Sequence, residues 1–539
     1  MSEYPSNCCG GKRAAWVCLA LAAFYLLYFA GSGAPPLTDN DEAVYGQVAR
    51  EMAPGDWLTP HYQGQPWFDK PPLFYWLTAA TTRVLGATEL AARLPSGLMA
   101  VALVLLVYAL TAFDFGRRAG LAAAVVVGTC LQQIILAHAA VTDMTLAATL
   151  VAALYGVRRW LAAGGSRPRV GWALLAGAMV GLATLAKGPV AMVLVALALG
   201  IHLGLTRRLR RLLSADAAAA VLAALLVAAP WFLAMYLLHG QQFVQGFLVA
   251  NNITRFLTPE HAQVTGHWYS YLLSLPILLA FFLPWSFFLP PALVREVRAN
   301  EGARWAATWA AVVFVFFSLS KTQLITYIFP MFPAVALLVG AWWAQLGEEP
   351  ALRRGLRRGL WVGTAVAAAL VPVLYFGAHR ALVGGPWRAA VLGGLLLVGF
   401  AVALWGEVAR RPGGPARGLW ALPAVMVVFT LWLVFVIMPL VSPLQGLKPL
   451  LDHLPADPTA RVIAFHLHRP SLIYYGGPRV EHLDQPEQVR PLLAGGPPVL
   501  VLCQSNQAGP ILAPGVRVLA QEGRWELLGN AAARLTGGK

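Results

Sequence analysis

Charged residues are scarce in this chain. Only 12% of its 539 residues are Asp, Glu, Lys or Arg, whereas 58% are hydrophobic and the mean hydropathy is +0.63. Because soluble globular domains carry about 25% charged residues, this composition excludes an ordinary soluble protein. Apolar runs of roughly 20 residues, the length that crosses a bilayer, recur as far as about Pro439. The sequence therefore predicts a mainly α, polytopic membrane protein.

Cysteine and the common catalytic motifs are scarce as well. Cys8, Cys9, Cys18, Cys130 and Cys503 form no disulfide framework, because only Cys503 is expected in an oxidising compartment. We find no heptad region, no repeat of solenoid period, and neither H-E-x-x-H nor paired-Cys spacing. These absences argue against redox chemistry and against a metal site of a known local motif.

The apolar runs define about thirteen candidate membrane spans. They cover residues 14–33, 93–113, 119–139, 144–160, 170–186, 188–205, 217–238, 270–292, 304–319, 323–344, 359–378, 389–408 and 418–440. If the N-terminus is cytoplasmic, the inner connections carry more than twice as many Lys and Arg as the outer ones, as the positive-inside rule requires. The net charge of +16 is thus mainly a topology signal, and we expect no nucleic-acid partner.

This topology predicts two domains. Residues 1–440 would form a transmembrane catalytic domain, with periplasmic loops at 34–92 and 239–269, and residues 441–539 a periplasmic α/β domain. In that domain, helices are expected near 447–454 and 486–493, and strands near 461–467, 471–475, 498–503 and 516–520. It contains no Gly-rich phosphate loop, nucleophile elbow or metal motif.

The first outer loop concentrates acidic residues between Asp39 and Glu89. Val44, Val48 and Met52 recur at helical spacing, so residues 41–52 should form a short helix on the membrane surface. The pair Pro71-Pro72 should keep the residues before it extended. Carboxylates, a lysine and aromatic rings would then meet beside the bilayer.

Acids in this setting suggest transfer chemistry. Asp41 is the first catalytic candidate, with Glu42 beside it, because a carboxylate can stabilise an oxocarbenium-like sugar, take a proton or hold an ammonium group. The alternative for Asp41 is a helix cap. Asp143 is the second candidate, since it is an isolated acid in an apolar stretch; a purely structural pairing with Lys187 is its alternative.

Cations on the same face suggest phosphate binding. Lys70 lies in the segment stiffened by the prolines, and Arg255 can clamp a phosphate through two hydrogen bonds. Snorkelling to lipid headgroups is the alternative. Further substrate-binding candidates are Tyr45, Asp69, Lys187, Lys321 and Tyr327.

Several motifs resemble the GT-C class of membrane glycosyltransferases, which use polyprenyl-phosphate sugars. They are D-E-x-x-Y-x-x-x-A-R-E-M (Asp41 to Met52), G-D-W…F-D-K-P-P-L-x-Y-W (Gly55 to Trp76), A-x-x-D (Ala140 to Asp143), A-K-G-P (Ala186 to Pro189), R-F…H (Arg255, Phe256, His267) and S-K-T-x-L-x-T-Y-I-x-P-x-F-P (Ser320 to Pro333). Within the class, the chain looks like the lipid A aminoarabinose transferase branch, related to the protein O-mannosyltransferases. It departs from close enterobacterial members at Asp69, where they carry Glu.

The resemblance implies phosphate binding at Lys70 and Arg255 and a thirteen-span core followed by a periplasmic domain. It also implies transfer of 4-amino-4-deoxy-L-arabinose from undecaprenyl phosphate to a lipid A phosphate in the inner membrane, with resistance to polymyxin and cationic peptides. We expect a monomer that requires no cofactor; zinc held by His267, Glu42 and Asp69 is the alternative. Rival functions are hexose transfer to protein hydroxyls or another glycan, transport of a lipid, and a non-catalytic lipid scaffold.

Overall fold

The computed structural model describes residues 8–39, 41–258, 272–347, 349–379, 385–409, 416–445, 447–454, 460–477 and 480–535. Their contacts group into two compact units. The first contains Met1–Ala30, Trp67–Leu77 and Arg93–Leu433, and the second contains Gly31–Pro66, Thr78–Ala92 and Val434–Lys539. The second unit therefore joins most of the first outer loop to the C-terminal region. The predicted boundary at residue 440, between a transmembrane catalytic domain and a periplasmic domain, stays a prediction.

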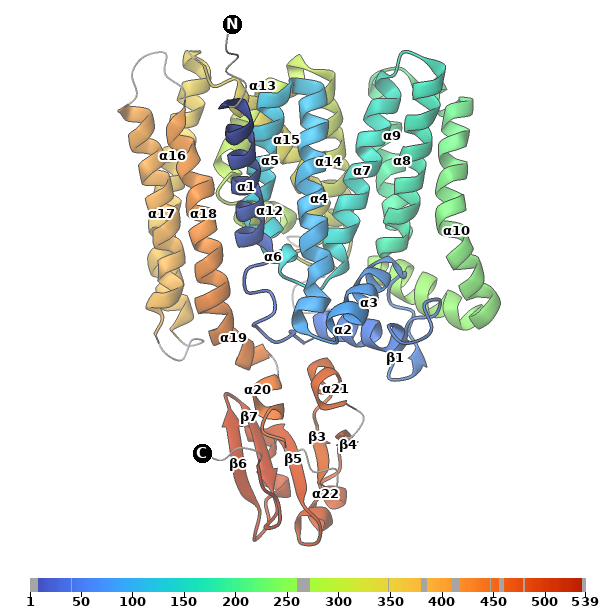
Figure 1. Cartoon of the computed structure of the whole chain (residues 1–539), viewed down its shortest axis with the longest axis vertical. Coiled ribbons are helices and arrows are strands. Elements are labelled where there is room, and N and C mark those ends of the chain that lie inside the picture. Colours follow the sequence, from blue (N-terminus) through green and yellow to red (C-terminus); the bar gives the residue numbers. More distant parts are fainter. Residues whose placement is uncertain are drawn as a thin grey trace, which may run out of the picture. The chain divides into compact units, whose positions relative to one another are not determined.

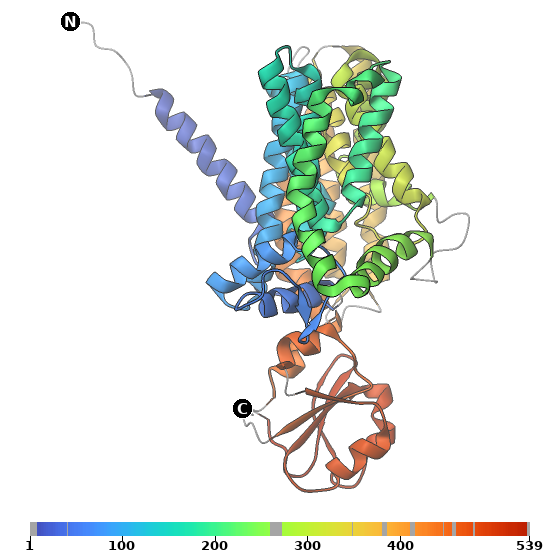
Figure 2. The ribbon, with the colours of Figure 1, turned by 90° about the vertical axis from the view of Figure 1, so that its right-hand side faces the viewer.

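The first unit is a bundle of helices that run side by side (Figures 1 and 2). In chain order its helices are α1 (Cys8–Tyr28), α4 (Glu89–Phe115), α5 (Arg117–Gly128), α6 (Leu131–Ala137), α7 (Thr142–Ala162), α8 (Ser166–Lys187), α9 (Val190–Leu205), η1 (Leu209–Leu213), α10 (Ala215–Phe243), η2 (Val244–Thr254), α11 (Arg255–Leu257), α12 (Ser274–Phe281), η4 (Ser286–Phe288), α13 (Leu289–Ala299), α14 (Glu301–Leu319), η5 (Phe329–Met331), α15 (Phe332–Ala344), α16 (Pro350–Ala378), α17 (Trp387–Val408), η6 (Arg417–Trp420) and α18 (Ala421–Trp432). Helix α3 (Leu73–Leu85) begins in this unit and ends in the other.

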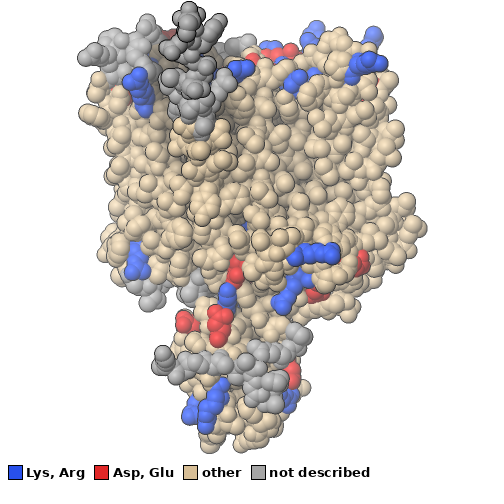
Figure 3. Space-filling model, in the orientation of Figure 1, with Lys and Arg blue, Asp and Glu red and all other residues tan. Residues whose placement is uncertain are grey.

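Seven helices of the described chain are long and apolar enough to cross a membrane, or nine if each of two bent pairs counts as one span. Shorter apolar helices, such as Val190–Leu205, accompany them. The protein is thus a mainly helical, multi-pass membrane protein, as predicted. Each of the thirteen predicted ranges contains a helix, but thirteen separate crossings stay a prediction. The face seen in Figure 3 agrees with a membrane-embedded wall, because a broad band of the helical unit shows no charged residue.

The two bent pairs are joined to each other. Helices α5 and α6 meet at 63°, and the pair formed by α12 and residues 286–293 meets at 111°. At the breaks, the backbone N–H of Leu131 donates to the carbonyl of Leu283 at 3.0 Å, and Trp285 Nε1 donates to Thr129 Oγ1 at 3.1 Å. Because a bilayer core offers no water to satisfy backbone groups released at a helix break, each break supplies hydrogen-bond partners for the other.

The C-terminal part of the second unit is a five-stranded mixed sheet. Its strands are β3 (Arg461–Phe465), β4 (Val480–Leu483), β5 (Val499–Gln504), β6 (Arg517–Glu522) and β7 (Trp525–Gly529), in the order β4-β3-β5-β7-β6. Strands β4, β3 and β5 are parallel, with Ile463 opposite Val501, and β7 is antiparallel to both β5 and β6. Helices and a short hairpin complete the unit: α2 (Asp41–Met52), β1 (His61–Tyr62), β2 (Gln65–Pro66), η7 (Leu433–Ile437), α19 (Met438–Gln445), α20 (Lys448–Leu451), α21 (Pro470–Gly476), α22 (Pro486–Leu493), η9 (Ser505–Gln507) and η10 (Gly509–Ile511).

Alternate residues of the central strands build two cores, as the pleat of a strand requires. Val462 and Leu500 pack in a cluster with residues of α20, whereas Ile463 and Val501 pack in another with Val489 of α22. The predicted small α/β domain is therefore observed near the C-terminus.

Most predicted elements of this region are confirmed, and one is wrong. The helices at 41–52 and 486–493 and the strands near 461, 498 and 516 are present. The predicted strand at 471–475 is instead helix α21, which begins at Pro470. Proline suits the first turn of a helix because its missing N–H is not needed there, and this outweighed the strand preference of Ile and Tyr.

Candidate functional site

A polar cavity of about 240 Å³ lies within the helical unit. Its charged lining consists of three cations, Lys70, Lys187 and Arg255, and one carboxylate, Asp69. Apolar side chains complete the wall together with four polar ones, which are Asn251, Asn252, Ser320 and Tyr327. Five residues predicted from the sequence to bind substrate therefore share one hollow. Its excess of positive charge suits an anion such as a phosphate.

Lys70 is placed by the two prolines that follow it. They end the extended segment, and α3 begins directly after them at Leu73. The Lys70 side chain is largely buried, and its ammonium donates to Asp69 Oδ1 at 2.7 Å. Burial lowers the pKa of Lys70 from its ordinary value, and the Asp69 carboxylate offsets only part of this effect. The lysine therefore loses its charge more easily than a surface lysine.

Arg255 approaches the same carboxylate from another element. It follows the π-helix η2, and its Nη1 lies 3.7 Å from Asp69 Oδ1. Within η2, the amides of Asn251 and Asn252 donate to the carbonyls of Gly246 and Phe247 at 2.9 and 2.7 Å. Single π-helical turns are rare and are frequent at functional sites. Here the π-helix brings Arg255 and Asn252 to the wall of one cavity.

Lys187 forms the third corner of the cavity. It ends α8, where the helix dipole favours a cation. Its ammonium donates to Asp143 Oδ1 at 2.6 Å and lies 4.8 Å from the ring centre of Tyr327. Asp143, in the first turn of α7, is 7% exposed. The pairing of Asp143 with Lys187 is therefore observed, whereas the catalytic role predicted for Asp143 stays a prediction.

The remaining predicted residues lie elsewhere. Lys321 is exposed, and its neighbour Ser320 lines the cavity in its place. Asp41, Glu42 and Tyr45 belong to α2 in the second unit. Asp41 is exposed at the start of the helix and Tyr45 is buried. Glu42 is buried and accepts hydrogen bonds from both the backbone N–H and the hydroxyl of Thr38 at 2.9 Å. The roles predicted for all four residues stay predictions.

The proposed zinc ligands do not form a visible set. His267 lies outside the described residues. Glu42 is bonded to Thr38, and Asp69 faces Lys70 and Arg255. Across the part of the chain that is described, no three His, Cys, Asp or Glu side chains gather as a metal site would require.

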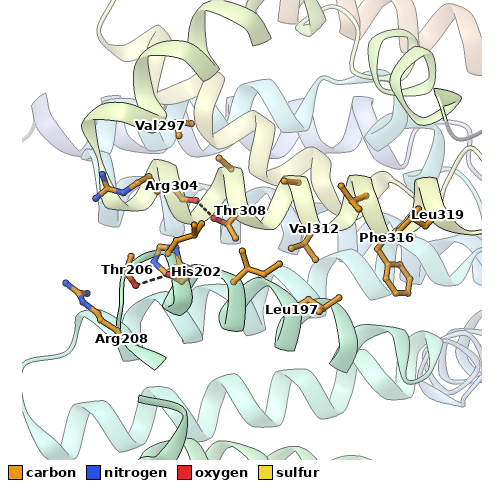
Figure 4. A pocket seen from close by; sticks show the side chains of 15 residues that line it. Leu197, His202, Thr206, Arg208, Val297, Arg304, Thr308, Val312, Phe316 and Leu319 are labelled. Carbon is orange, nitrogen blue, oxygen red and sulfur yellow. Dashed lines mark hydrogen bonds between the residues drawn. The ribbon is translucent and has the colours of Figure 1, made fainter. Parts of the chain in front are cut away.

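A larger, mostly apolar cavity of about 970 Å³ lies between α9 and α14 (Figure 4). His202, Arg208 and Arg304 stand at one end, and Phe316 and Leu319 at the other. Phe316 lines the polar cavity as well, so the two hollows adjoin. Arg208 pairs with Glu301 at 3.1 Å. Nothing in the sequence pattern distinguished this groove, because its Leu, Val and Ile residues look like those of any membrane span.

Comparison with known proteins decides the family. The chain is 31% identical over 76% of its length to the undecaprenyl phosphate-α-4-amino-4-deoxy-L-arabinose arabinosyl transferase 1 of Pseudomonas fluorescens, 70% of which is covered. A transferase of the same name from Pseudomonas aeruginosa strain UCBPP-PA14 is 33% identical over 77% of the chain, with 76% of its own length covered. The chain belongs to this arabinosyl transferase family.

Two further similarities support the family and its fold. Residues 69–233 match the family described as dolichyl-phosphate-mannose-protein mannosyltransferase. The crystal structure of ArnT from Cupriavidus metallidurans bound to undecaprenyl phosphate superposes with a TM-score of 0.81 at 23% identity, covering 96% of this chain and 99% of that one. The resemblance inferred from the motifs is thus confirmed, including the membership in the GT-C class.

Proposed function

We propose that this protein transfers 4-amino-4-deoxy-L-arabinose from undecaprenyl phosphate to a phosphate group of lipid A. It would act as a monomer in the bacterial inner membrane with thirteen spans, a cytoplasmic N-terminus and a periplasmic C-terminal domain. The observation that carries the proposal is the cavity lined by Lys70, Arg255 and Lys187, in which Lys70 and Arg255 face the Asp69 carboxylate and Lys187 pairs with Asp143. Family membership indicates the identity of the sugar and of its lipid carrier, since the names of the relatives contain both.

The proposed reaction breaks the bond between the sugar's anomeric carbon and the carrier phosphate. An oxygen of the lipid A phosphate forms the new bond to that carbon, and undecaprenyl phosphate leaves with the electron pair. Negative charge therefore grows on the departing phosphate, where Lys70 and Arg255 would stabilise it. The attacking phosphate is already an anion and needs no base, so Asp41 would bind the sugar's ammonium group instead.

Chemical analysis of lipid A tests this function. Lipid A extracted from cells that express the chain should carry aminoarabinose, and cells that lack it should not. The same strains should differ in survival with polymyxin, because the added amine reduces the net negative charge of the outer surface. Lipid A that gains no aminoarabinose would overturn the proposal.

A second candidate, hexose transfer to protein hydroxyls, is favoured by the match of residues 69–233 to the protein mannosyltransferases. It predicts glycosylated protein and unmodified lipid A.

The groove between α9 and α14 fits the carrier's isoprenoid chain, because it is apolar and adjoins the cation-lined cavity at Phe316. We expect Val315→Trp, at a groove position 53% exposed, to raise the KM for a 55-carbon donor about tenfold, since losing contact with roughly two methylene groups costs ~1.4 kcal/mol. The KM for a short-chain donor should not change. Leu233→Trp on α10, exposed and outside the groove, is the matched control. An equal change for both donors would contradict the assignment of the groove to the chain.

A further inference from the structure

Helix α21 of the C-terminal region packs against α2, the helix that begins with Asp41. Both belong to the second unit. Gly46 lies in the contact, where a Cβ would come within 2.9 Å of Leu37 and 3.2 Å of the Tyr474 ring. The family resemblance assigned no role to this region, and its sequence carries no catalytic motif. Its contacts with α2 therefore need an explanation of their own.

One contact fixes the chain just before α2. Asp39, whose side chain is 5% exposed, accepts a hydrogen bond from the backbone N–H of Ser471 at 2.8 Å. Its other oxygen lies 3.5 Å from Arg469 Nη1. Arg469 in turn lies over the ring of Trp525 in β7, at 5.2 Å from the ring centre. Asp39 thus ties the start of α2 to α21 and, through Arg469, to the sheet.

A second contact joins three separate segments through one hydroxyl. The backbone N–H of Leu37 donates to Tyr475 Oη at 2.6 Å, and that hydroxyl donates to Glu89 Oε1 at 3.1 Å. Glu89 also pairs with Lys448. Burial, with the nearby Glu89 carboxylate adding to it, raises the pKa of Tyr475, so the hydroxyl keeps the proton that it donates.

A third contact holds the far end of α2. The Nη1 of Arg50 donates to the carbonyl of Tyr474 at 2.9 Å, and its guanidinium lies 5.9 Å from the centre of that ring. The carbonyl is one of the last in α21, where helices leave acceptors unpaired and favour cations. Contacts at both ends of α2 therefore restrain its translation and its rotation.

We propose that α21 is the positioning element for Asp41, and that the Asp39, Tyr475 and Arg50 contacts hold α2 where that carboxylate can act. This inference rests on the proposed function, because it assumes that Asp41 meets the sugar. Asp39 is two residues from Asp41, so a change at Ser471 or Tyr475 is transmitted over a very short segment of chain. A displacement on the order of 1 Å in a group that positions the substrate can reduce the rate about a hundredfold.

The decisive variants remove single contacts and keep side-chain size. Tyr475→Phe deletes the hydroxyl between Leu37 and Glu89, and Lys448→Gln removes the cation paired with Glu89. We expect each to lower kcat about tenfold at saturating donor while the KM for the donor changes less than about twofold. Lys448→Arg, which keeps a cation for Glu89, should restore kcat. Arg461→Gln is the matched control, because it breaks an exposed ion pair with Glu481 in the same sheet.

Hydrogen exchange of the full-length protein separates positioning from folding and from the proposed function. In Tyr475→Phe, the amides of residues 41–52 should exchange faster, while those of β3 and β5 keep their protection. Unchanged kcat and unchanged exchange in both variants would overturn the positioning role even if the wild type is active. A wild-type protein that transfers no aminoarabinose overturns the proposed function instead, and the exchange rates then decide alone whether α21 restrains α2.

Discussion

The Lys70→Gln variant is expected to show a KM for the donor about a hundredfold above that of the wild type, with a smaller change in kcat. Removing one partner of a buried, hydrogen-bonded charge pair costs roughly 2–5 kcal/mol. Here the variant removes the lysine, and the donor's phosphate would be the partner left without it. Isothermal titration or steady-state kinetics with the lipid-linked donor measures the effect. Arg83→Gln, on the exposed last turn of α3, should leave the KM unchanged.

The pH dependence sharpens this test. Lys70 would bind the donor's phosphate only while protonated, and burial lowers its pKa. Donor affinity should therefore be highest below that lowered pKa and decline as the pH rises through it, before an ordinary lysine would titrate. Lys70→Arg should bind the donor less well, because the two side chains differ in shape, but its affinity should not decline over the same range. Identical alkaline profiles for Lys70 and Arg would contradict the phosphate-binding role.

Asp41→Asn is the second variant with a large expected effect. It should lower kcat/KM by at least about tenfold, since the neutral amide loses the charge that would hold the sugar's ammonium group, and a hydrogen bond to a charged group contributes roughly 1.5–3 kcal/mol. Asparagine keeps the size of the side chain and suits the start of a helix as well as aspartate does. Because Asp41 is exposed, thermal unfolding in detergent should occur at the same temperature as in the wild type.

The contrast with Glu42 makes the Asp41 experiment decisive. Glu42→Gln should affect α2 itself, because Glu42 is bonded to Thr38, and should lower the unfolding temperature more than Asp41→Asn does. If Asp41→Asn keeps full activity, Asp41 serves only as a helix cap and the chemistry assigned to it is wrong.

Local sequence predicted the polar cavity better than it predicted the backbone around it. Lys70 and Lys187 stood out because charge is rare in this chain and each lies next to a proline or glycine that ends a helix or prevents one. Hydropathy gave the 119–139 and 270–292 segments as single spans. It could not show that each is bent, because the bends depend on hydrogen bonds between segments more than 150 residues apart, such as Trp285 to Thr129.

The second unit shows the same limit. The helix at 41–52 was predicted from the spacing of Val44, Val48 and Met52, and its bounds agree with the structure. Within the acids near this helix, the sequence predicts Asp41 and Glu42 as catalytic candidates. In the structure, Asp39 bonds to Ser471 and Glu42 to Thr38, so neighbouring acids have different partners. No single-sequence signal reveals a partner that lies 432 residues away.

Asp69 has a consequence for turnover. Its carboxylate faces both Lys70 and Arg255. If these two cations bind the donor's phosphate as proposed, that phosphate would compete with the Asp69 carboxylate for them. This competition would lower the affinity of the site for any phosphate, including that of the product undecaprenyl phosphate. The product would then dissociate sooner. The donor and the product carry the same phosphate headgroup, so a product that stayed bound would block the next donor. Faster dissociation of the product would therefore allow faster turnover.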